Sequence, residues 1–376
     1  MKALCDREQL LEAFGMVGGV IPARSPKPIL QNVKLVADGE AGSTLLATDL
    51  EVGIRCRVLG MKVDKAGAAI LPAGRMNQIL RVGTDQELAI ETDDNHLIIR
   101  GLHEEFRLSA EDPALYPEVP DFNATSYHVV SAGDLKRLIK RTIFATEVES
   151  TRYALGGVLF ELGPESITLV GTDGRRLAQA RAVAETEGNP SIPPGTPVVP
   201  VKALKLIERN LNDDDPPVHI AFVGNTGNAT AVLVRTERAV IHSRLVEGRF
   251  PRYQDVFPTT VDVRIPMEAG TLRVAVEKAS IVTNDETRGV DFRFADGFLK
   301  LSSEAADIGK AHVELPIKHD GKAVEITFDA RYLAEALRAL DDNTPITAEL
   351  IDHKSAAVFR TEDQYAYVVM PLTRER

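Results

Sequence analysis

The order of predicted elements repeats three times along the chain. A first helix is predicted at residues 6–20, 131–146 and 266–283, and a second at residues 72–82, 200–211 and 329–340. Corresponding helices begin about 130 residues apart, which is a usual size for one domain. The repeat therefore restricts the 376-residue chain to three similar units, predicted at residues 1–125, 126–256 and 257–376.

The segments between and after these helices alternate apolar and polar residues, as strands with one buried face do. Residues 291–301 form two alternating runs around Asp296-Gly297, a strong tight-turn signal. Residues 88–100 and 158–170 follow the same hairpin design. Each unit is therefore predicted to be α+β, with two helices packed on one side of an antiparallel sheet.

The segment 131–146 predicts a helix with one apolar face and one basic face. Leu135, Leu138 and Ile139 recur at helical spacing and share the apolar face. The basic face is formed by Lys136, Arg137, Lys140 and Arg141. Ser131 is placed as an N-cap, with Asp134 three residues later. Considered alone, such a helix would be a solvated surface helix.

The distribution of charge separates the helices from the rest of the chain. The net charge is −11, which argues against a protein coated in positive charge for nucleic-acid binding. The six predicted helices nevertheless carry +5 together, so the remaining residues carry −16, the difference between those values. Lys202, Lys205 and Arg209 also share one helical face. This pattern favours a protein that meets a polyanion on one surface only.

Catalytic, metal-binding and membrane classes find little support. The chain lacks the phosphate-binding loop, the nucleophile elbow and the zinc-protease motif. The acidic runs at residues 213–215 and 341–342 follow predicted helices and are typical of turns. Cys5 and Cys56 show no metal-ligand spacing, and we expect no disulfide between them. With no signal-peptide pattern and no long apolar run, we expect a cytoplasmic protein without metal or cofactor.

The segment 171–177 is predicted by its residues only as a turn between strands. Asp173 would make an Asx-type bond, and Gly174 would supply a positive φ.

An ordered set of motifs closely resembles the bacterial DNA polymerase III beta subunit family, the sliding clamps. The similarity runs from Met1 to Leu372. The motifs are Arg24-x-x-x-Pro28-Ile-Leu30, Thr48-Asp49-Leu-Glu51, Arg152-Tyr153-x-Leu155-x-Gly157, Thr172-Asp173-Gly174-x-Arg176-Leu177-Ala178, Val246-x-Gly248-Arg249-Phe250-Pro251-x-Tyr253 and Tyr367-Val-Val-Met-Pro-Leu372. The resemblance implies three similar domains in a crescent, and two crescents closed head-to-tail into a ring. It also implies a non-enzymatic processivity factor, with helices lining the hole and sheets forming the outer wall.

The resemblance implies a first working surface inside the ring. There the clamp would surround duplex DNA and touch phosphates without reading bases. The matching positions are Arg24, Arg75, Arg137, Lys140, Arg152, Tyr153 and Lys202.

The resemblance implies a second surface, an apolar cleft between the second and third units. It would capture short peptides from the DNA polymerase III alpha subunit, the clamp loader, other polymerases and repair proteins. The matching positions are Leu155, Thr172, Gly174, Arg175, Arg176, Leu177, Pro251, Val256, Tyr332, Val368, Val369, Met370, Pro371 and Leu372. Leu155, Leu177, Val256 and Met370 are expected to form the pocket floor. Deletion of everything after Tyr367 is expected to abolish peptide binding while the dimer survives.

The sequence departs from the family pattern at the cleft rim and at the expected ring joint. Asp255 stands where the best-known member has Arg, and Thr287 where it has Phe, so the rim would prefer different peptides. The joint of that member pairs basic residues of the first unit with acids of the third, whereas residues 103–108 here include two glutamates. Apolar residues are therefore expected to matter more for the homodimer: Phe106, Leu108, Ile281 and Val282.

Two other classes remain open on the residues alone. One is a metal-dependent nucleotidyltransferase or nuclease that uses dispersed acids, and magnesium-dependent activity would identify it. The other is a repeat protein that binds only proteins, which retention on closed circular DNA would distinguish from a clamp.

Overall fold

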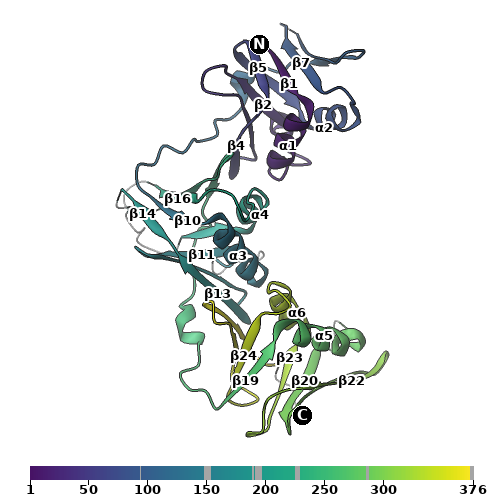
Figure 1. The fold of residues 1–376 in the computed structure, drawn as a ribbon, viewed down its shortest axis with the longest axis vertical. Coiled ribbons are helices and arrows are strands. Elements are labelled where there is room, and N and C mark those ends of the chain that lie inside the picture. Colours follow the sequence, from purple (N-terminus) through teal and green to yellow (C-terminus); the bar gives the residue numbers. More distant parts are fainter. Residues whose placement is uncertain are drawn as a thin grey trace. The chain divides into compact units, whose positions relative to one another are not determined.

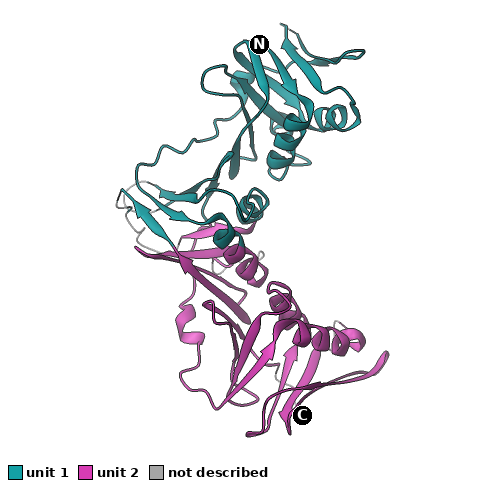
Figure 2. Cartoon of the chain, in the orientation of Figure 1, with its two compact units in different colours: residues 1–136, 184–195, 202–245 teal, residues 137–183, 196–201, 246–376 magenta. Residues whose placement is uncertain are grey.

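The computed structural model describes residues 1–93, 95–147, 154–188, 190, 197–224, 229–284 and 288–372. It forms two compact units (Figure 2). The first comprises residues 1–136, 184–195 and 202–245, and the second residues 137–183, 196–201 and 246–376. The middle third of the chain therefore contributes to both units.

Six α-helices occur in the described part of the chain, one at each predicted place (Figure 1). They are α1 (Arg7–Val17), α2 (Ala73–Val82), α3 (Ala132–Thr142), α4 (Val201–Arg209), α5 (Ala269–Ala279) and α6 (Ala330–Arg338). Short 3-10 turns extend α3 and α5, at η3 (Ile143–Ala145) and η5 (Ser280–Val282). The others are η1 (Pro28–Gln31), η2 (Pro113–Leu115) and η4 (Tyr253–Val256).

Three predicted helix starts were wrong for one shared reason. Pro72, Pro200 and Pro266 belong to strands, and the helices begin one to three residues later. All three strands lie at sheet edges, where the missing N–H of proline is tolerated. A proline therefore marked the end or interior of an edge strand at these places, rather than the first turn of a helix.

Side-chain caps fix several helix starts. Asp6 accepts a hydrogen bond from the Gln9 N–H at 2.9 Å, and Asp329 accepts one from the Arg331 N–H at 3.0 Å. The predicted cap of α3 is confirmed, because the Ser131 hydroxyl accepts the Asp134 N–H at 3.1 Å. The same hydroxyl donates to the Asp134 carboxylate at 2.8 Å.

The first unit contains two antiparallel sheets. The smaller has the order β5 (Met61–Lys65), β1 (Lys2–Asp6), β7 (Glu87–Thr92), β8 (His96–Arg100) and β9 (Glu105–Ser109). The larger has the order β14 (Glu185–Glu187), β10 (Tyr127–Val130), β16 (Val218–Val223), β17 (Ala231–Arg235), β18 (Ala239–Arg244), β4 (Val52–Arg57), β3 (Thr44–Thr48), β2 (Asn32–Ala37) and β6 (Gly67–Pro72).

The second unit also contains two antiparallel sheets. The larger has the order β15 (Val198–Pro200), β11 (Gly157–Leu162), β12 (Ser166–Thr172), β13 (Arg176–Val183), β26 (Tyr365–Val369), β25 (Ala357–Arg360), β24 (Pro345–Leu350) and β19 (Val263–Glu268). The smaller has the order β22 (Gly309–Pro316), β21 (Phe298–Ala305), β20 (Gly289–Ala295) and β23 (Val324–Asp329).

In each larger sheet, one strand pairing joins a strand of one sequence repeat to a strand of the next repeat. In the first unit β4 pairs with β18, with Val52 opposite Ser243. In the second unit β13 pairs with β26, with Leu177 opposite Val368. The same joint is thus made twice, between strands that occupy corresponding places in successive repeats.

The predicted hairpin at Asp296-Gly297 is confirmed. Ala295 lies opposite Phe298, so the loop has two residues, with φ of 53° at Asp296 and 76° at Gly297. Two successive positive φ values are typical of a type I′ turn, which matches the right-handed twist of the flanking strands.

Gly171 allows β12 to approach the end of α3. A Cβ at this position would lie 2.2 Å from the Thr142 carbonyl oxygen, whereas a Cβ at Gly74 in α2 would meet nothing within 4 Å.

We expect Gly171→Ala to lower the free energy of unfolding by about 1–3 kcal/mol, because the backbone must move. Gly74→Ala should raise it by about 0.5–1 kcal/mol.

Urea denaturation monitored by circular dichroism, with both variants run beside the unmodified protein, measures this difference. If Gly171→Ala unfolds at the same urea concentration as Gly74→Ala, the close approach of β12 to α3 does not constrain the fold.

Candidate functional site

The turn between β12 and β13 is held by its own polar side chains. The Thr172 hydroxyl donates to the Arg176 carbonyl at 2.6 Å and accepts the Gly174 N–H at 3.1 Å. The Asp173 carboxylate accepts the N–H groups of Arg175 and Arg176, each at 2.9 Å. Gly174 has a φ of 85°. The predicted Asx-type turn is confirmed, and it fixes the backbone that carries Arg175 and Arg176.

The turn between β3 and β4 repeats this arrangement in the first unit. The Thr48 hydroxyl donates to the Val52 carbonyl at 2.9 Å, and Asp49 accepts the N–H groups of Glu51 and Val52. Leu50 takes the place of Gly174, with a φ of 82°. A left-handed leucine costs of order 1–3 kcal/mol, so the rest of this turn holds it there. The internal repeat therefore extends to individual hydrogen bonds.

Arg176 is a buried side chain that joins several elements of the second unit. Its guanidinium donates to Asp173 at 3.0 Å, to the Phe144 carbonyl at 2.8 Å and to Glu335 of α6. It also lies 4.4 Å from the centre of the Tyr332 ring. Burial opposes the charge, but Tyr367, Glu335 and Asp173 outweigh it and raise the pKa of Arg176. Arg176 therefore stays charged and positions the turn rather than offering itself to a ligand.

The segment after Tyr367 divides into a core part and an exposed part. Val368 and Val369 are fully buried in β26, opposite Leu177 and Arg176 of β13. Met370 is 42% exposed, and its N–H donates to the Arg175 carbonyl at 2.9 Å. The Leu372 N–H donates to the backbone carbonyl of Thr327, in β23, at 2.8 Å. The structure therefore joins residues 370–372 to both the β12–β13 turn and the smaller sheet.

The residues expected to form the pocket floor differ in their exposure. Leu155, Leu177 and Val368 belong to a buried cluster that also contains Phe250 and Tyr253. Met370 is exposed instead, and so is Val256, at 41%. Residues that were expected to share one floor therefore divide into a core that supports the surface and an exposed part that a ligand could contact.

The remaining cleft candidates are half-buried or exposed. Pro251, Tyr332 and Pro371 are half-buried, while Gly174, Arg175 and Leu372 are exposed. The Tyr367 hydroxyl donates to the Tyr332 carbonyl at 2.8 Å, which ties α6 to β26. Burial raises the pKa of Tyr367 well above its usual value, so its hydroxyl remains a donor at neutral pH.

Sequence reasoning missed the residues that hold Arg176. Glu335 and Phe144 are 159 and 32 positions away from it in the chain, and neither belongs to a motif. Only the side-chain contacts reveal them.

The DNA-facing candidates occupy different environments. Arg24, Arg75 and Lys140 are exposed, and Arg137 is half-buried. Lys202 is exposed and donates a hydrogen bond to the Asp49 carboxylate. Burial would raise the pKa of Asp49, but its hydrogen bonds, including the one from Lys202, lower this pKa below its usual value. Arg152 and Tyr153 lie outside the described residues.

The basic face of α4 is confirmed, and that of α3 is partly wrong. Lys202, Lys205 and Arg209 are all exposed, while Leu204, Leu206 and Ile207 are buried. In α3, Arg141 is buried, and its Nη1 lies 2.6 Å from Oδ2 of Asp363. Its guanidinium also lies 5.5 Å from the centre of the Tyr365 ring. The helical position of Arg141 predicted an exposed base, but it is buried because it pairs with an acid 222 residues away in the sequence.

The dimer candidates lie on two separate elements. Phe106 and Leu108 are half-buried on β9, which is the edge strand of the smaller sheet of the first unit. Ile281 is 74% exposed and Val282 is half-buried, both on η5.

The described residues contain no group of three His, Cys, Asp or Glu side chains that could hold a metal ion. Cys5 and Cys56 are buried free thiols, and burial raises their pKa values to about 12 and about 11. Neither thiol is therefore ionised at neutral pH. No helix in the described ranges is long and apolar enough to cross a membrane.

Three domain models of one family match the chain in succession. They are the N-terminal domain of the DNA polymerase III beta subunit at residues 1–120, its central domain at 129–252 and its C-terminal domain at 254–373. A curated relative, the beta sliding clamp of Escherichia coli (strain K12), is 30% identical over 376 residues, which cover 99% of this chain and 100% of the relative. The beta sliding clamp of Pseudomonas aeruginosa is 30% identical over 98% of each chain.

Solved structures agree with this match. The DNA polymerase III subunit beta of Pseudomonas aeruginosa superposes with a TM-score of 0.89 at 28% identity, covering 100% of both chains. The sliding clamp of Bartonella birtlesii gives 0.88 at 29% identity, again over 100% of both chains. The fold is the three-domain α+β architecture of these proteins, and the chain belongs to the DNA polymerase III beta subunit family, the sliding clamps.

Proposed function

We propose that this sliding clamp works as a cytoplasmic homodimeric ring, which encircles duplex DNA and tethers the replicative polymerase to it. Members of the family are non-catalytic processivity factors, and we infer that this chain has no catalytic site of its own. The domains would span residues 1–125, 126–256 and 257–376. The observation that carries this proposal is the succession of three family domains over residues 1–373 of one chain.

The DNA-facing surface would consist of the basic helix faces and the segments beside them. The proposed residues are Arg24, Arg75, Arg137, Lys140, Arg152, Tyr153 and Lys202. Exposed side chains on α2, α3 and α4 support this surface, because flexible bases can follow phosphates without fixing the protein at one sequence. In the last third, Arg273 and Arg338 pair with Asp342 and Glu277, as Lys202 pairs with Asp49 in the first unit.

Arg75→Glu combined with Lys140→Glu should weaken direct binding to linear duplex DNA about tenfold or more at low salt, because phosphate contacts are lost. The matched control is Lys62→Glu combined with Lys65→Glu, which makes the same charge change on exposed residues of strand β5. Fluorescence anisotropy with a labelled duplex measures both. An equal loss in the two variants would mean that binding follows net charge and that the helix faces have no special part.

The peptide-binding surface would use the exposed apolar residues beside the β12–β13 turn. The proposed residues are those of the sequence analysis, with Leu155, Leu177, Val368 and Val369 supporting the surface from the core and Arg176 positioning the turn. The bond from the Met370 N–H to the Arg175 carbonyl supports this site, because it holds an exposed flexible side chain beside a rigid turn. A partner peptide would place a few apolar anchors there, and those would carry most of the binding energy. Asp255 and Thr287 would adjust the preference for peptides at the rim.

Because Val368 and Val369 are core residues, the truncation test must start after them. Deleting residues 370–376, or changing Met370→Ala, should weaken binding of a polymerase-tail peptide about tenfold or more, since an anchor contact is lost. Val183→Ala, at an exposed position at the far end of β13, should have no effect. Anisotropy measures the peptide, and light scattering checks the dimer. Unchanged peptide affinity would remove the cleft assignment, and loss of the dimer would make the segment structural.

The ring joint would rest on Phe106, Leu108, Ile281 and Val282 rather than on charges. Glu105 of β9 already pairs within its own sheet, with Arg100 at 2.6 Å and Arg107 at 2.7 Å. On β22, Glu314 pairs with Lys300 at 3.1 Å. Charges that are neutralised within each sheet gain little from a partner protomer.

Light scattering at micromolar concentration should therefore give twice the 41.0 kDa of the chain. The dimer dissociation constant should change less than about threefold between 0.1 M and 1 M salt, because screening acts on exposed charge pairs and not on apolar contacts. A monomer at all concentrations would exclude the ring. A dimer that dissociates steeply with salt would show that charge pairs hold the joint.

A further inference from the structure

A pocket of about 290 Å³ lies within the first unit, between α1, the end of α4 and the turn that joins β17 to β18. These three elements come from two successive sequence repeats. Small-molecule sites begin at about 300 Å³ and combine a hollow with a few fixed polar groups. The pocket therefore has the size of a site for a small metabolite, and its polar groups decide which class of metabolite fits.

Arg238 lines this pocket from the β17–β18 turn with only part of its guanidinium paired. Its Nη1 lies 2.7 Å from the Glu12 carboxylate. Its Nε and Nη2 are buried and have no hydrogen-bond partner among the described residues. These two atoms form the edge of a guanidinium that binds a carboxylate or phosphate through two parallel hydrogen bonds. Arg238 is therefore suited to hold an oxyanion at two points.

Asn210 lines the same pocket just after α4, and it is only 6% exposed. Its Nδ2 donates to the Leu206 carbonyl at 2.8 Å, whereas its Oδ1 has no partner within the described part of the chain. An amide oxygen only accepts hydrogen bonds, and a buried polar group without a partner costs stability. A ligand that satisfies both Arg238 and Asn210 therefore needs an oxyanion beside a hydrogen-bond donor.

Gly15 keeps one wall of the pocket free of side chain. It lies inside α1, where glycine is less favourable than alanine. A Cβ at Gly15 would meet nothing within 4 Å, so packing within the protein does not require glycine there. An unfavourable residue beside an open hollow is expected where a ligand approaches the backbone closely.

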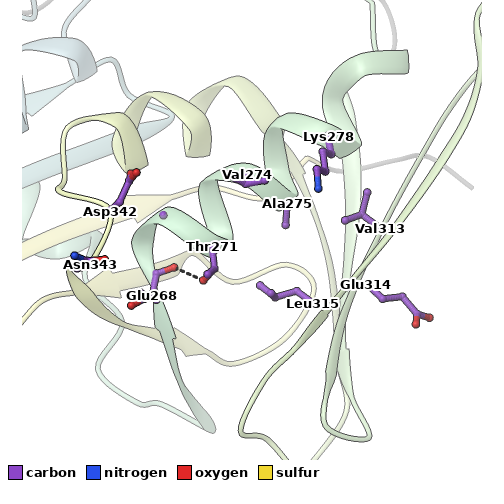
Figure 3. A pocket seen from close by; sticks show the side chains of 11 residues that line it. Glu268, Thr271, Val274, Ala275, Lys278, Val313, Glu314, Leu315, Asp342 and Asn343 are labelled. Atoms are coloured by element: carbon purple, nitrogen blue, oxygen red, sulfur yellow. Dashed lines mark hydrogen bonds between the residues drawn. The ribbon is translucent and has the colours of Figure 1, made fainter.

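The larger groove between α5 and β22, of about 410 Å³, lacks these features (Figure 3). Val274 and Leu315 line it, and Glu314 points away from it (Figure 3). Asp342, near one end, already pairs with Arg273 at 2.9 Å. Among the described residues that line this groove, none has a buried side-chain polar atom without a partner. The unpartnered groups, and not the size of the hollow, therefore distinguish the pocket beside Arg238.

The charges around the pocket select the kind of oxyanion. Glu12, Asp215 and Glu237 line it together with Arg209 and Arg238, so three acids and two bases give a net charge of −1. A phosphate would add further negative charge and would be repelled. An α-amino acid instead carries a carboxylate for Arg238 and, one carbon away, an ammonium group that can donate to an amide oxygen. A basic side chain would also balance the net negative charge.

We propose that this pocket binds a basic α-amino acid, with its carboxylate on Arg238 and its α-ammonium group on the Asn210 oxygen. The side-chain ammonium group lies toward Glu237, which is exposed at the rim. Because Nε and Nη2 of Arg238 are covered, the ligand enters as Glu12 turns aside. The Glu12 side chain is 54% exposed, so its pair with Arg238 opens at little cost. The bound ligand then joins α1 to the β17–β18 turn, and the proposal does not depend on the ring.

Isothermal titration calorimetry with three related probes tests the ligand class on the full chain. L-Lysine should bind saturably. Cadaverine is lysine without its carboxylate, so it should bind about tenfold more weakly or worse, because the two-point contact with Arg238 is lost. L-Norleucine, which lacks the side-chain ammonium group, should bind more weakly than L-lysine.

Three outcomes of this titration overturn the proposal. Equal binding of cadaverine would show that the acids attract any amine. Tighter binding of inorganic phosphate would make the pocket an anion site. Absence of binding by all the probes would show that the unpartnered groups serve no ligand of this class.

Substitutions locate the binding in this pocket. Arg238→Lys keeps the charge but removes the two-point edge, so it should weaken L-lysine binding about tenfold or more. The matched control is Arg244→Lys, at an exposed position of β18, which should bind as the unmodified protein does. Equal affinity in the two variants would place the ligand elsewhere.

A blocking variant provides a second readout that does not change charge. Gly15→Leu should abolish L-lysine binding because its side chain enters the pocket, while leucine favours the helix more than glycine does. Gly74→Leu is the control, since α2 has the same open space at that position. Thermal unfolding checks that both variants are folded. Binding retained by folded Gly15→Leu would contradict the proposal.

Discussion

The pairing of β13 with β26 is the constraint on which the candidate peptide surface depends. Backbone hydrogen bonds between these strands set Leu177 opposite Val368, although the two residues are far apart in the sequence. Because β26 ends at Val369, the exposed Met370 emerges beside the β12–β13 turn and bonds to Arg175. A strand pairing thereby decides which residues support the surface and which are offered to a ligand. The equivalent pairing of β4 with β18 gives the first unit the same joint.

Arg176 adds a second constraint to this surface. A buried guanidinium is stable only when its charge is paired and its N–H groups are hydrogen-bonded. Here Asp173 of the turn, the Phe144 carbonyl after α3 and Glu335 of α6 each accept a hydrogen bond from Arg176. The turn is therefore fixed before any ligand arrives, which reduces the entropy lost on binding. Met370 is the adaptable side chain beside this rigid frame, which would suit the proposed binding of several peptides.

The edge strands β9 and β22 carry charges that discourage indiscriminate pairing. β9 and β22 each place charges on one face and apolar residues on the other. Their charges are paired within each sheet, so they cost little when exposed, yet they penalise registers that set like charges together. Specific association would then come from the apolar residues that flank the edges.

The sequence by itself determined the repeat, the six helix positions, the hairpins and the turn at residues 172–177. These depend on local patterns: periodicity, caps and turn residues act within a few positions. Only the tertiary structure decided that Arg141 is buried by Asp363, that Pro266 lies in a strand and that Val368 is core. It also decided the partners of Arg176. Each of these depends on groups brought together from distant parts of the chain, and strand pairing and burial are set by the whole fold, which local spacing does not encode.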